Sequence, residues 1–348
     1  MSTPAPLEPV DALRRIAFLM ERTRGETRRV EAYRKAAATL LATPADEVAR
    51  RIANGTITDL PGIGKSTGAA ITAAAAGEVP DRLAELEATA AGPLVEGGQE
   101  LLAAVRGDLH SHSDWSDGGS PIEEMVATAM ELGREYLALT DHSPRLRVAN
   151  GLSAERLTRQ LGIVDAINGH LGDDFRLLRG IEVDILDDGT LDQTPEMLDR
   201  LDVVVASVHS KLKMPKAQMT RRMVAAVSRP RTNVLGHCTG RLVTGGRGTR
   251  PQSEFDAAAV FAACAEHDVA VEINSRPERC DPPDELIGLA LDAGCLFSID
   301  TDAHAPGQLD FLAYGCERAQ RLGVPADRII TTWPVDQLLA WARPEPAA

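Results

Sequence analysis

The histidines of this chain fall at positions that suit metal binding. Six of the eight end or closely follow short apolar runs, while His170 and His267 lie inside helical patterns. A lone histidine at such a position is usually a hydrogen-bonded polar group, but six at one topological position indicate a shared site. Carboxylates stand at equivalent positions. In chain order, the nine candidate metal ligands are His110, His112, Asp117, His142, Glu182, His209, His237, Asp302 and His304.

The spacing of these ligands indicates which ions they could hold. Residues i and i+2 of a strand point the same way, so His110 with His112 can hold one ion, and so can Asp302 with His304. Imidazole and carboxylate together favour Zn, Mn or Fe over Ca. One four-coordinate ion would leave most of the nine ligands unused. We therefore expect two or three divalent metal ions, bridged by Glu182.

Clustered divalent ions predict a phosphoesterase. They lower the pKa of bound water and neutralise charge on a phosphate ester, so we expect in-line attack by a metal-bridging hydroxide held by Glu182, His209 and Asp302. No GxSxG motif offers a competing serine nucleophile. Phosphate oxygens that are not on a metal need cationic partners. The candidates for binding substrate phosphate are Lys211, Arg241, Arg145 and Arg276.

The elements that must position these residues begin near residue 106. Short apolar, β-branched runs alternate there with longer amphipathic stretches, which predicts a parallel α/β architecture. In a barrel the carboxyl ends of all parallel strands meet around one mouth, whereas an open sheet spreads them along an edge. Ligands at the ends of six of the seven runs favour the barrel. The runs are GDLHSH, YLALTDH, LLRGIEVDI, VVVASVH, TNVLGH, AVEINS and LFSIDTDAH.

The first part of the chain has a different hydrophobic periodicity. Apolar residues recur at helical spacing over residues 11–87, which predicts a small all-α domain, residues 1–87, followed by a linker, residues 88–105. The segment LPGIGKST is not a nucleotide-binding P-loop, because Asp59 stands where that motif needs its first glycine. It fits a helix-hairpin-helix turn that contacts DNA phosphate, although a purely structural turn is the alternative. The expected DNA contacts are Gly62, Ile63, Gly64, Lys65, Ser66 and Thr67.

Composition narrows the class of protein. The formal net charge is −14, with 13 Lys/Arg and 14 Asp/Glu in residues 1–106 and 24 against 37 in the remainder. Only residues 14–35, with eight basic and three acidic side chains, look suited to an anionic partner. No run of ~18 apolar residues and no signal pattern occur, so we expect a cytoplasmic protein with no membrane span. The five cysteines, which form no CxxC pair, are expected to be reduced and buried.

The ordered motifs resemble those of the PHP (polymerase and histidinol phosphatase) domain, and most closely the PHP domain of bacterial family X DNA polymerases. They are DLHSHSDWSDG, LALTDHS, RGIEVDI, ASVHS, LGHCTGRL, VEINSRPERCD and IDTDAHAPGQLDFLAYG. The resemblance runs from residue 106 to about residue 325, within a barrel domain of residues 106–348. It implies a distorted seven-stranded (β/α) barrel with a trinuclear metal centre. All nine candidate ligands fall on matching positions.

The first part of the chain resembles the N-terminal 8-kDa domain of family X polymerases over residues 11–87. The likeness rests on RTRGETRRVEAYRKAAATLL and LPGIGKSTGAAI. That family carries a lyase lysine where this chain has Ala70, so the resemblance implies DNA binding without lyase chemistry. The linker has no room for a polymerase palm, and we expect no DNA synthesis.

Three hypotheses of function remain open at this stage. The first is a metal-dependent enzyme for DNA ends, acting as a 3′–5′ exonuclease or 3′-phosphoesterase in DNA repair, with abasic sites as a further substrate. The second is a small-molecule phosphatase of the histidinol-phosphatase type, which leaves the helical domain unexplained. The third is a non-catalytic DNA-binding protein, against which the complete ligand set speaks.

Overall fold

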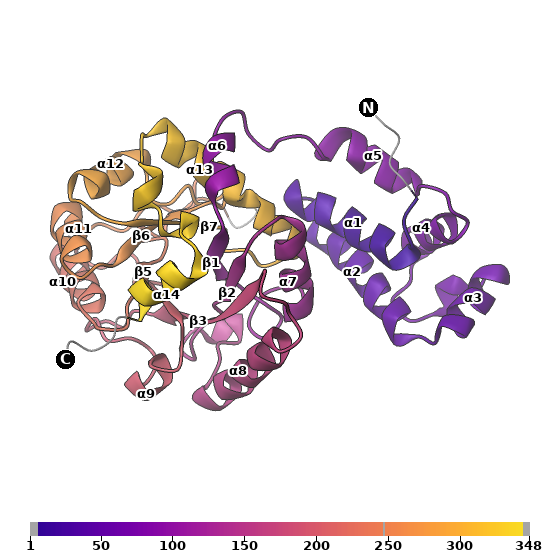
Figure 1. The fold of residues 1–348 in the computed structure, drawn as a ribbon, viewed down its shortest axis with the longest axis horizontal. Helices are drawn as coiled ribbons and strands as arrows, with labels where there is room; N and C mark the ends of the chain where they lie inside the picture. The colour runs from indigo at the N-terminus through magenta and orange to yellow at the C-terminus, as the bar shows by residue number, and fades with distance from the viewer. Residues whose placement is uncertain (1–5, 246–247, 344–348) are drawn as a thin grey trace. The chain divides into compact units, whose positions relative to one another are not determined.

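The computed structural model describes residues 6–245 and 248–343 (Figure 1). The chain divides into two compact units. The helical unit comprises residues 1–93 with 306–308, and the barrel unit comprises residues 94–305 with 309–348. Helix α6 (Gln99–Ala104), which lies within the segment expected to be a linker, packs against α13 (Leu312–Arg321) of the barrel unit.

The helical unit forms because its helices each present one apolar face. The helices are α1 (Pro9–Arg22), α2 (Thr27–Ala42), α3 (Ala45–Ala53), η1 (Ile57–Asp59), α4 (Lys65–Ala75) and α5 (Asp81–Ala90). Leu13 and Ile16 of α1 are fully buried and share one apolar cluster with Val30 and Tyr33 of α2 and Ile71 of α4. The helical spacing in the sequence therefore predicted this core.

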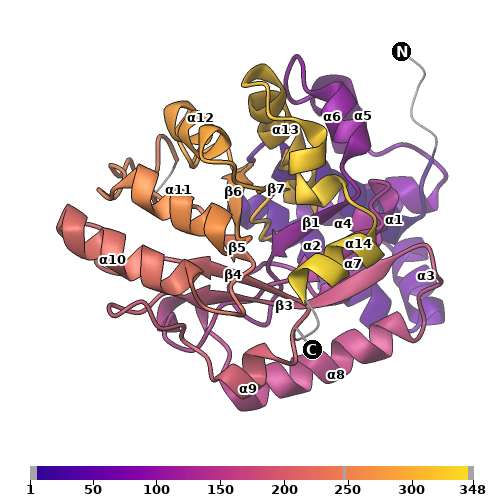
Figure 2. The same cartoon turned by 60° about the vertical axis from the view of Figure 1, so that its left-hand side comes forward.

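Seven parallel strands form the barrel unit, in the order β1 to β7. They are β1 (Gly107–Ser111), β2 (Tyr136–Leu139), β3 (Arg176–Asp184), β4 (Val203–Ser207), β5 (Val234–Leu235), β6 (Ala270–Asn274) and β7 (Phe297–Asp300). The helices that follow them are α7 (Ile122–Glu131), α8 (Ala154–Asn168), α9 (Pro195–Leu198), α10 (Lys216–Val227), α11 (Ala257–Glu266), α12 (Asp284–Asp292), α13, and α14 (Val335–Ala342). Figure 2 shows α8, α10, α11 and α12 succeeding one another around the outside of the sheet.

The sheet curves until its first and last strands meet. Leu109 of β1 donates its N–H to the Asp300 carboxylate of β7 at 2.8 Å, and Ser111 forms a parallel bridge with Ala303. Consecutive parallel strands with right-handed helical crossovers close in this way when the sheet twists. The seven-stranded α/β barrel predicted from the sequence is confirmed.

On the face that points into the barrel, β4 and β6 are apolar at their beginnings and polar toward their ends. Along β4, Val203 and Val205 belong to one apolar cluster, while Val204 and Ala206 belong to another that contacts the helices. The alternation continues into β6, where Ala270 lies on the inner face and Glu272 follows two residues later. Apolar side chains thus fill one end of the barrel and leave the other end for polar groups.

Candidate metal centre

The nine predicted ligands come together at the carboxyl ends of the strands. His110 and Glu182 lie within β1 and β3, and the others lie in the segments that directly follow β1, β2, β4, β5 and β7. Their ligand atoms form four overlapping groups, each within 4.8 Å. The groups are His112 with Asp117, His142 and His304; His110 with His112 and Asp302; His110 with Glu182 and His237; and His142 with Glu182 and His209.

Glu182 lies at the middle of this arrangement. Its carboxylate is 2.8 Å from His142 Nδ1 and 2.8 Å from His237 Nε2. The Nε2 atoms of three further imidazoles, those of His209, His110 and His112, lie 3.2, 3.4 and 3.6 Å from the same carboxylate. A carboxylate with two oxygens among five imidazoles can contribute to more than one metal position. This geometry suits the bridging role that the sequence predicted for Glu182.

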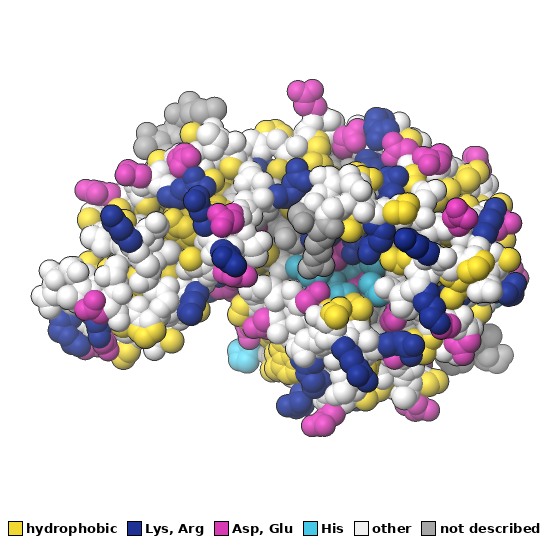
Figure 3. All heavy atoms as spheres, turned by 180° about the vertical axis from the view of Figure 1, so that it is seen from behind, with side chains coloured by type: hydrophobic (Ala, Val, Ile, Leu, Met, Phe, Trp, Pro, Cys, Tyr) yellow, Lys and Arg dark blue, Asp and Glu magenta, His cyan; other side chains and the backbone are white. Residues whose placement is uncertain are grey.

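The cluster opens on one side. The side chains of Asp117 and His304 are 34% and 20% exposed, whereas His110 and His112 are fully buried. Asp117 Oδ1 lies 3.4 Å from the Nε2 atoms of both His142 and His304. Figure 3 shows histidine side chains gathered in a hollow of the surface that Lys and Arg side chains border. A substrate would therefore approach the group that contains Asp117 and His304.

The donor atoms of the cluster fit divalent ions. Both ring nitrogens of His112 and of His209, and Nε2 of His110, are buried and make no hydrogen bond within residues 6–245 and 248–343. Buried polar atoms without a partner are costly, and they are rare unless an ion, water or ligand satisfies them. Imidazole nitrogens mixed with carboxylate oxygens are ligands for Zn, Mn or Fe. The residues present could hold two or three such ions.

The pKa shifts within the cluster also fit the binding of divalent ions. Burial lowers the pKa of His112 to about 3, and His304 and His142 add to the shift, so the ring is neutral and one of its nitrogens has a lone pair for an ion. Burial also lowers the pKa of His142, but Glu182 and Asp117 outweigh it and raise that pKa to about 10. Burial raises the pKa of Glu182, yet the surrounding imidazoles, His209 first, hold it well below its usual range. Without metal, protons on imidazoles such as His142 offset the negative charge of Glu182 and Asp117. Metal binding would release these protons, because the ions would supply the positive charge instead.

Buried groups behind the cluster were missed by the sequence analysis. Glu272 of β6 lies 2.5 Å from His110 Nδ1 and also accepts the backbone N–H of His237. Arg279 forms an ion pair with Asp302 at 2.9 Å. A carboxylate that accepts from the second ring nitrogen orients a metal-binding imidazole. The only sequence signal for Glu272 is an acidic residue within an otherwise apolar strand.

The four cations expected to bind phosphate are differently placed. The Arg276 guanidinium lies 3.0 Å from His304 Nδ1, at the open side of the cluster. Arg241 instead donates to the backbone carbonyls of the segment after β6, and Lys211 forms an ion pair with Asp187. Arg145 is exposed. Of the four, the structure brings Arg276 to the predicted ligands.

The loop predicted to contact DNA precedes α4 in the helical unit. Gly62 adopts φ 90°, a backbone conformation that favours glycine, and Gly64 caps α4. Lys65 and Ser66 are exposed, as is Gly64, whereas Ile63 and Thr67 are buried. The Thr67 hydroxyl accepts the Gly64 N–H at 2.9 Å. Thr67 therefore shapes the turn from inside, and the exposed part of the loop is its backbone with Lys65 and Ser66. Ala70 is buried in α4.

The basic segment 14–35 contributes less free charge than its composition suggests. Arg34 forms a buried ion pair with Glu21 at 2.7 Å, and Arg15 pairs with Glu87 at 2.6 Å. Arg22 is buried and donates to the backbone carbonyls of Ala90, at the end of α5, and Gly92. Three of the eight basic side chains thus stabilise the helical unit itself.

Two domain families match this chain. Residues 108–276 match the PHP domain, and residues 6–78 match a helix-hairpin-helix domain. The barrel unit is therefore a PHP domain, of the metal-dependent hydrolase class, and the helical unit contains a helix-hairpin-helix domain. Both resemblances expected from the sequence motifs are confirmed. No helix among the described residues is long and apolar enough to cross a membrane.

Individual relatives match part of this chain. The DNA polymerase/3′-5′ exonuclease PolX of Bacillus subtilis (strain 168) is 39% identical over 220 residues, which are 63% of this chain and 38% of PolX. The chain thus spans well under half of PolX. Probable phosphatase YcdX of Escherichia coli (strain K12) is 27% identical over 241 residues, covering 65% of this chain and 90% of YcdX. A histidinol phosphate phosphatase from Lactococcus lactis, solved with Zn, L-histidinol and phosphate, shares 18% identity over 62% of this chain and 92% of that chain, with a TM-score of 0.44.

Proposed function

We propose that this protein is a divalent-metal-dependent phosphoesterase that processes DNA ends in repair. Its expected activity is that of a 3′–5′ exonuclease or 3′-phosphoesterase, and abasic-site strands are a further substrate. The observation that carries the proposal is the cluster of nine imidazoles and carboxylates, buried except on one side, at the mouth of a PHP barrel. Water adds to phosphorus in this reaction, the bond to the leaving oxygen breaks, and that oxygen takes up a proton.

The roles of the chain's own residues follow from where they lie. The nine clustered side chains would hold the ions, which supply water of lowered pKa and neutralise phosphate charge. Arg276, beside His304 at the open side, would bind a phosphate oxygen and fix its orientation. Glu182, His209 and Asp302 would align the attacking water. We assign no phosphate contact to Arg241, because backbone carbonyls occupy its guanidinium.

Support for DNA as the substrate comes from the helical unit. The helix-hairpin-helix match includes the turn with exposed Lys65 and Ser66 and the exposed backbone of Gly64. Backbone N–H groups at a helix N-terminus bind phosphate without reading sequence. The PolX relative is named as a polymerase and 3′-5′ exonuclease, and its identity with this chain is the highest quoted above.

The test is digestion of end-labelled duplexes that carry 3′ overhangs, with Mn²⁺ or Zn²⁺ added to the full-length protein. We expect shortening from the 3′ end that stops when the ions are chelated. The Asp302→Ala variant should lose more than about 100-fold in rate, because even groups that only support metal ligands are worth 10–100-fold. It should still bind DNA. Intact duplex after incubation with fully metal-loaded protein would refute the proposal.

A second candidate is a phosphatase acting on small phosphomonoesters. The match to Probable phosphatase YcdX, which covers 90% of that protein, favours it. The two candidates differ in the ratio of kcat/KM for an oligonucleotide to that for a small phosphomonoester. A DNA enzyme should also lose oligonucleotide affinity steeply as salt rises, whereas a small-molecule phosphatase should not. An Asp302→Ala variant that keeps full in vitro activity would instead favour a metal site with a structural role only.

A further inference from the structure

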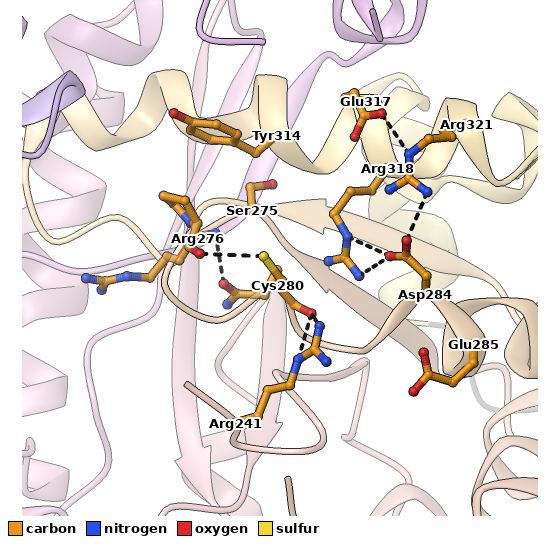
Figure 4. Close-up of a pocket in the computed structure, with 12 residues that line it drawn as sticks. Arg241, Ser275, Arg276, Cys280, Asp284, Glu285, Tyr314, Glu317, Arg318 and Arg321 are labelled. Atoms are coloured by element: carbon orange, nitrogen blue, oxygen red, sulfur yellow. Dashed lines mark hydrogen bonds and ion pairs between the residues drawn. The ribbon is translucent and has the colours of Figure 1, made fainter. Parts of the chain in front are cut away.

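A cavity of about 480 Å³ lies beside the metal cluster and has no role in the proposal above. The segment after β6 forms one wall, and the opposite wall comes from α13 and the start of α12 (Figure 4). This volume lies within the range of small-molecule binding sites and exceeds what a lone phosphate needs.

The cavity and the metal cluster share a wall. Asn274 lines the cavity, and its amide Nδ2 also lies 3.2 Å from Asp302 Oδ2. Arg276 lines it as well, and its guanidinium lies 3.0 Å from His304 Nδ1. A molecule whose phosphate lies at the cluster would therefore have its neighbouring group at the entrance of this cavity.

The lining offers an aromatic ring and hydrogen-bond donors. Tyr314 of α13 is partly exposed there, and its ring contacts Phe311 edge-on at 5.8 Å between centroids. The guanidinium groups of Arg276 and Arg321 line the cavity as well, and these side chains are 22% and 49% exposed. A bound group can therefore reach both the ring and these donors.

These features together select the class of ligand. A nucleobase presents a flat π face that can stack on tyrosine, and its ring acceptors suit guanidinium donors. We propose that this cavity binds the nucleoside of the strand-terminal nucleotide, with its base against Tyr314 and its phosphate at the metal cluster. The inference rests on the proposed function and names the group next to the phosphate that is hydrolysed.

The test compares the binding of thymidine 5′-monophosphate with that of inorganic phosphate. Calorimetric titration would use the full-length protein loaded with Mn²⁺, as wild type, Tyr314→Ala and Tyr314→Phe. We expect Tyr314→Ala to weaken nucleotide binding by about 5- to 150-fold, the usual worth of base stacking, and to leave phosphate binding unchanged. Tyr314→Phe keeps the ring and should stay within about twofold of wild type.

The outcomes separate the two proposals. Equal affinity for nucleotide and phosphate in the wild type, or a nucleotide affinity that Tyr314→Ala does not change, would overturn the cavity assignment even if DNA is digested. Tyr314-dependent nucleotide binding by a protein that digests no DNA would uphold the cavity and refute the proposed function. A parallel kinetic readout is the KM for thymidine 5′-(p-nitrophenyl phosphate) against that for methyl p-nitrophenyl phosphate, which lacks the nucleoside. Tyr314→Ala should raise only the first.

Discussion

The two candidate contact sites of this protein are built in opposite ways. The loop proposed to contact DNA is six consecutive residues, 62–67, shaped by a hydrogen bond between Gly64 and Thr67 only three positions apart. The metal cluster takes nine side chains from positions 110 to 304, and each depends on the closed barrel. Backbone contacts survive most side-chain changes, whereas a buried polar network depends on each of its members. A single substitution in the loop should therefore lower DNA affinity only slightly. A single substitution in the cluster should cause a large loss of metal binding and hydrolysis.

The largest effect is expected from Glu182→Gln, because Glu182 contacts more of the predicted ligands than its neighbours do. The amide keeps the size of the side chain but loses its charge and one acceptor atom. We expect at least one fewer ion per chain by plasma mass spectrometry and a loss of more than about 100-fold in phosphoester hydrolysis. Glu135→Gln, an exposed carboxylate paired with Arg106, is the control. Full metal content at an unchanged rate would contradict the bridging role.

Metal removal should destabilise the barrel unit and spare the helical unit. All three tryptophans lie in the barrel unit, so their fluorescence reports on that unit alone, while circular dichroism reports on both. Ions at 100–1,000 times their Kd stabilise by about 3–4 kcal/mol, equivalent to about 5–15 °C in a domain of this size. We expect chelation to lower the fluorescence-detected Tm by this amount. A shift below about 2 °C would mean that the barrel does not depend on its ions.

Glu272→Gln should weaken the cluster without removing a ligand. Glu272 contacts His110 Nδ1 and the backbone N–H of His237, so its loss frees the orientation of two ligands. We expect metal affinity to fall by about 10- to 100-fold, with the number of ions restored at saturating metal. Glu266→Gln, at the exposed end of α11, is the matched control. Unchanged affinity in a competition titration with a chelating dye would remove Glu272 from the site.

The helical unit should respond more mildly to Lys65→Glu. This exposed lysine lies at the first position of α4, where it would face DNA phosphate. Loss of one phosphate contact should reduce the slope of log K against log salt by about 1 and leave the turnover of small phosphodiesters unchanged. Arg159→Glu on α8, whose side chain is 62% exposed, makes the same change of charge in the barrel unit and is the control. Equal DNA affinity in both variants would place the DNA contact elsewhere.

The smallest effect concerns the thiols, all five of which lie in the barrel unit. Burial raises the pKa of Cys295 to about 11 and that of Cys316 to about 12. It also raises the pKa values of Cys238 and Cys264 well above the usual thiol range. Since the thiolate is the reactive form, these four should resist alkylation at pH 8 and react faster as pH rises. We expect one fast-reacting thiol per chain, the partly exposed Cys280 in the nucleoside cavity, and protection of it by thymidine 5′-monophosphate. Mass mapping of the alkylated residues checks both points.

Much of this architecture was predictable from the chain alone, because local rules decided it. The helical core follows from residues such as Leu13 and Ile16 at helical spacing, and the barrel follows from apolar runs separated by amphipathic stretches. The gathering of His110 with His304 was also predictable, since every parallel strand of a barrel ends at the same mouth.

Other features could not be predicted because their partners are distant in sequence. Glu272 acts on His110, which lies 162 positions earlier, and Arg279, which follows β6, pairs with Asp302, which follows β7. Long cationic side chains were the least predictable group. Arg241 turns to nearby carbonyls and Lys211 to Asp187, because a flexible side chain takes the nearest acceptor that burial makes available.

The sequence by itself determined the helical unit, the strand order and the nine ligands that reach the barrel mouth, since hydrophobic periodicity and parallel topology fix these. Tertiary structure alone decided which oxygen faces which imidazole, which side of the cluster is open, and that a cavity with Tyr314 adjoins it. These last properties depend on side-chain packing between elements far apart in the chain, and no local pattern encodes them.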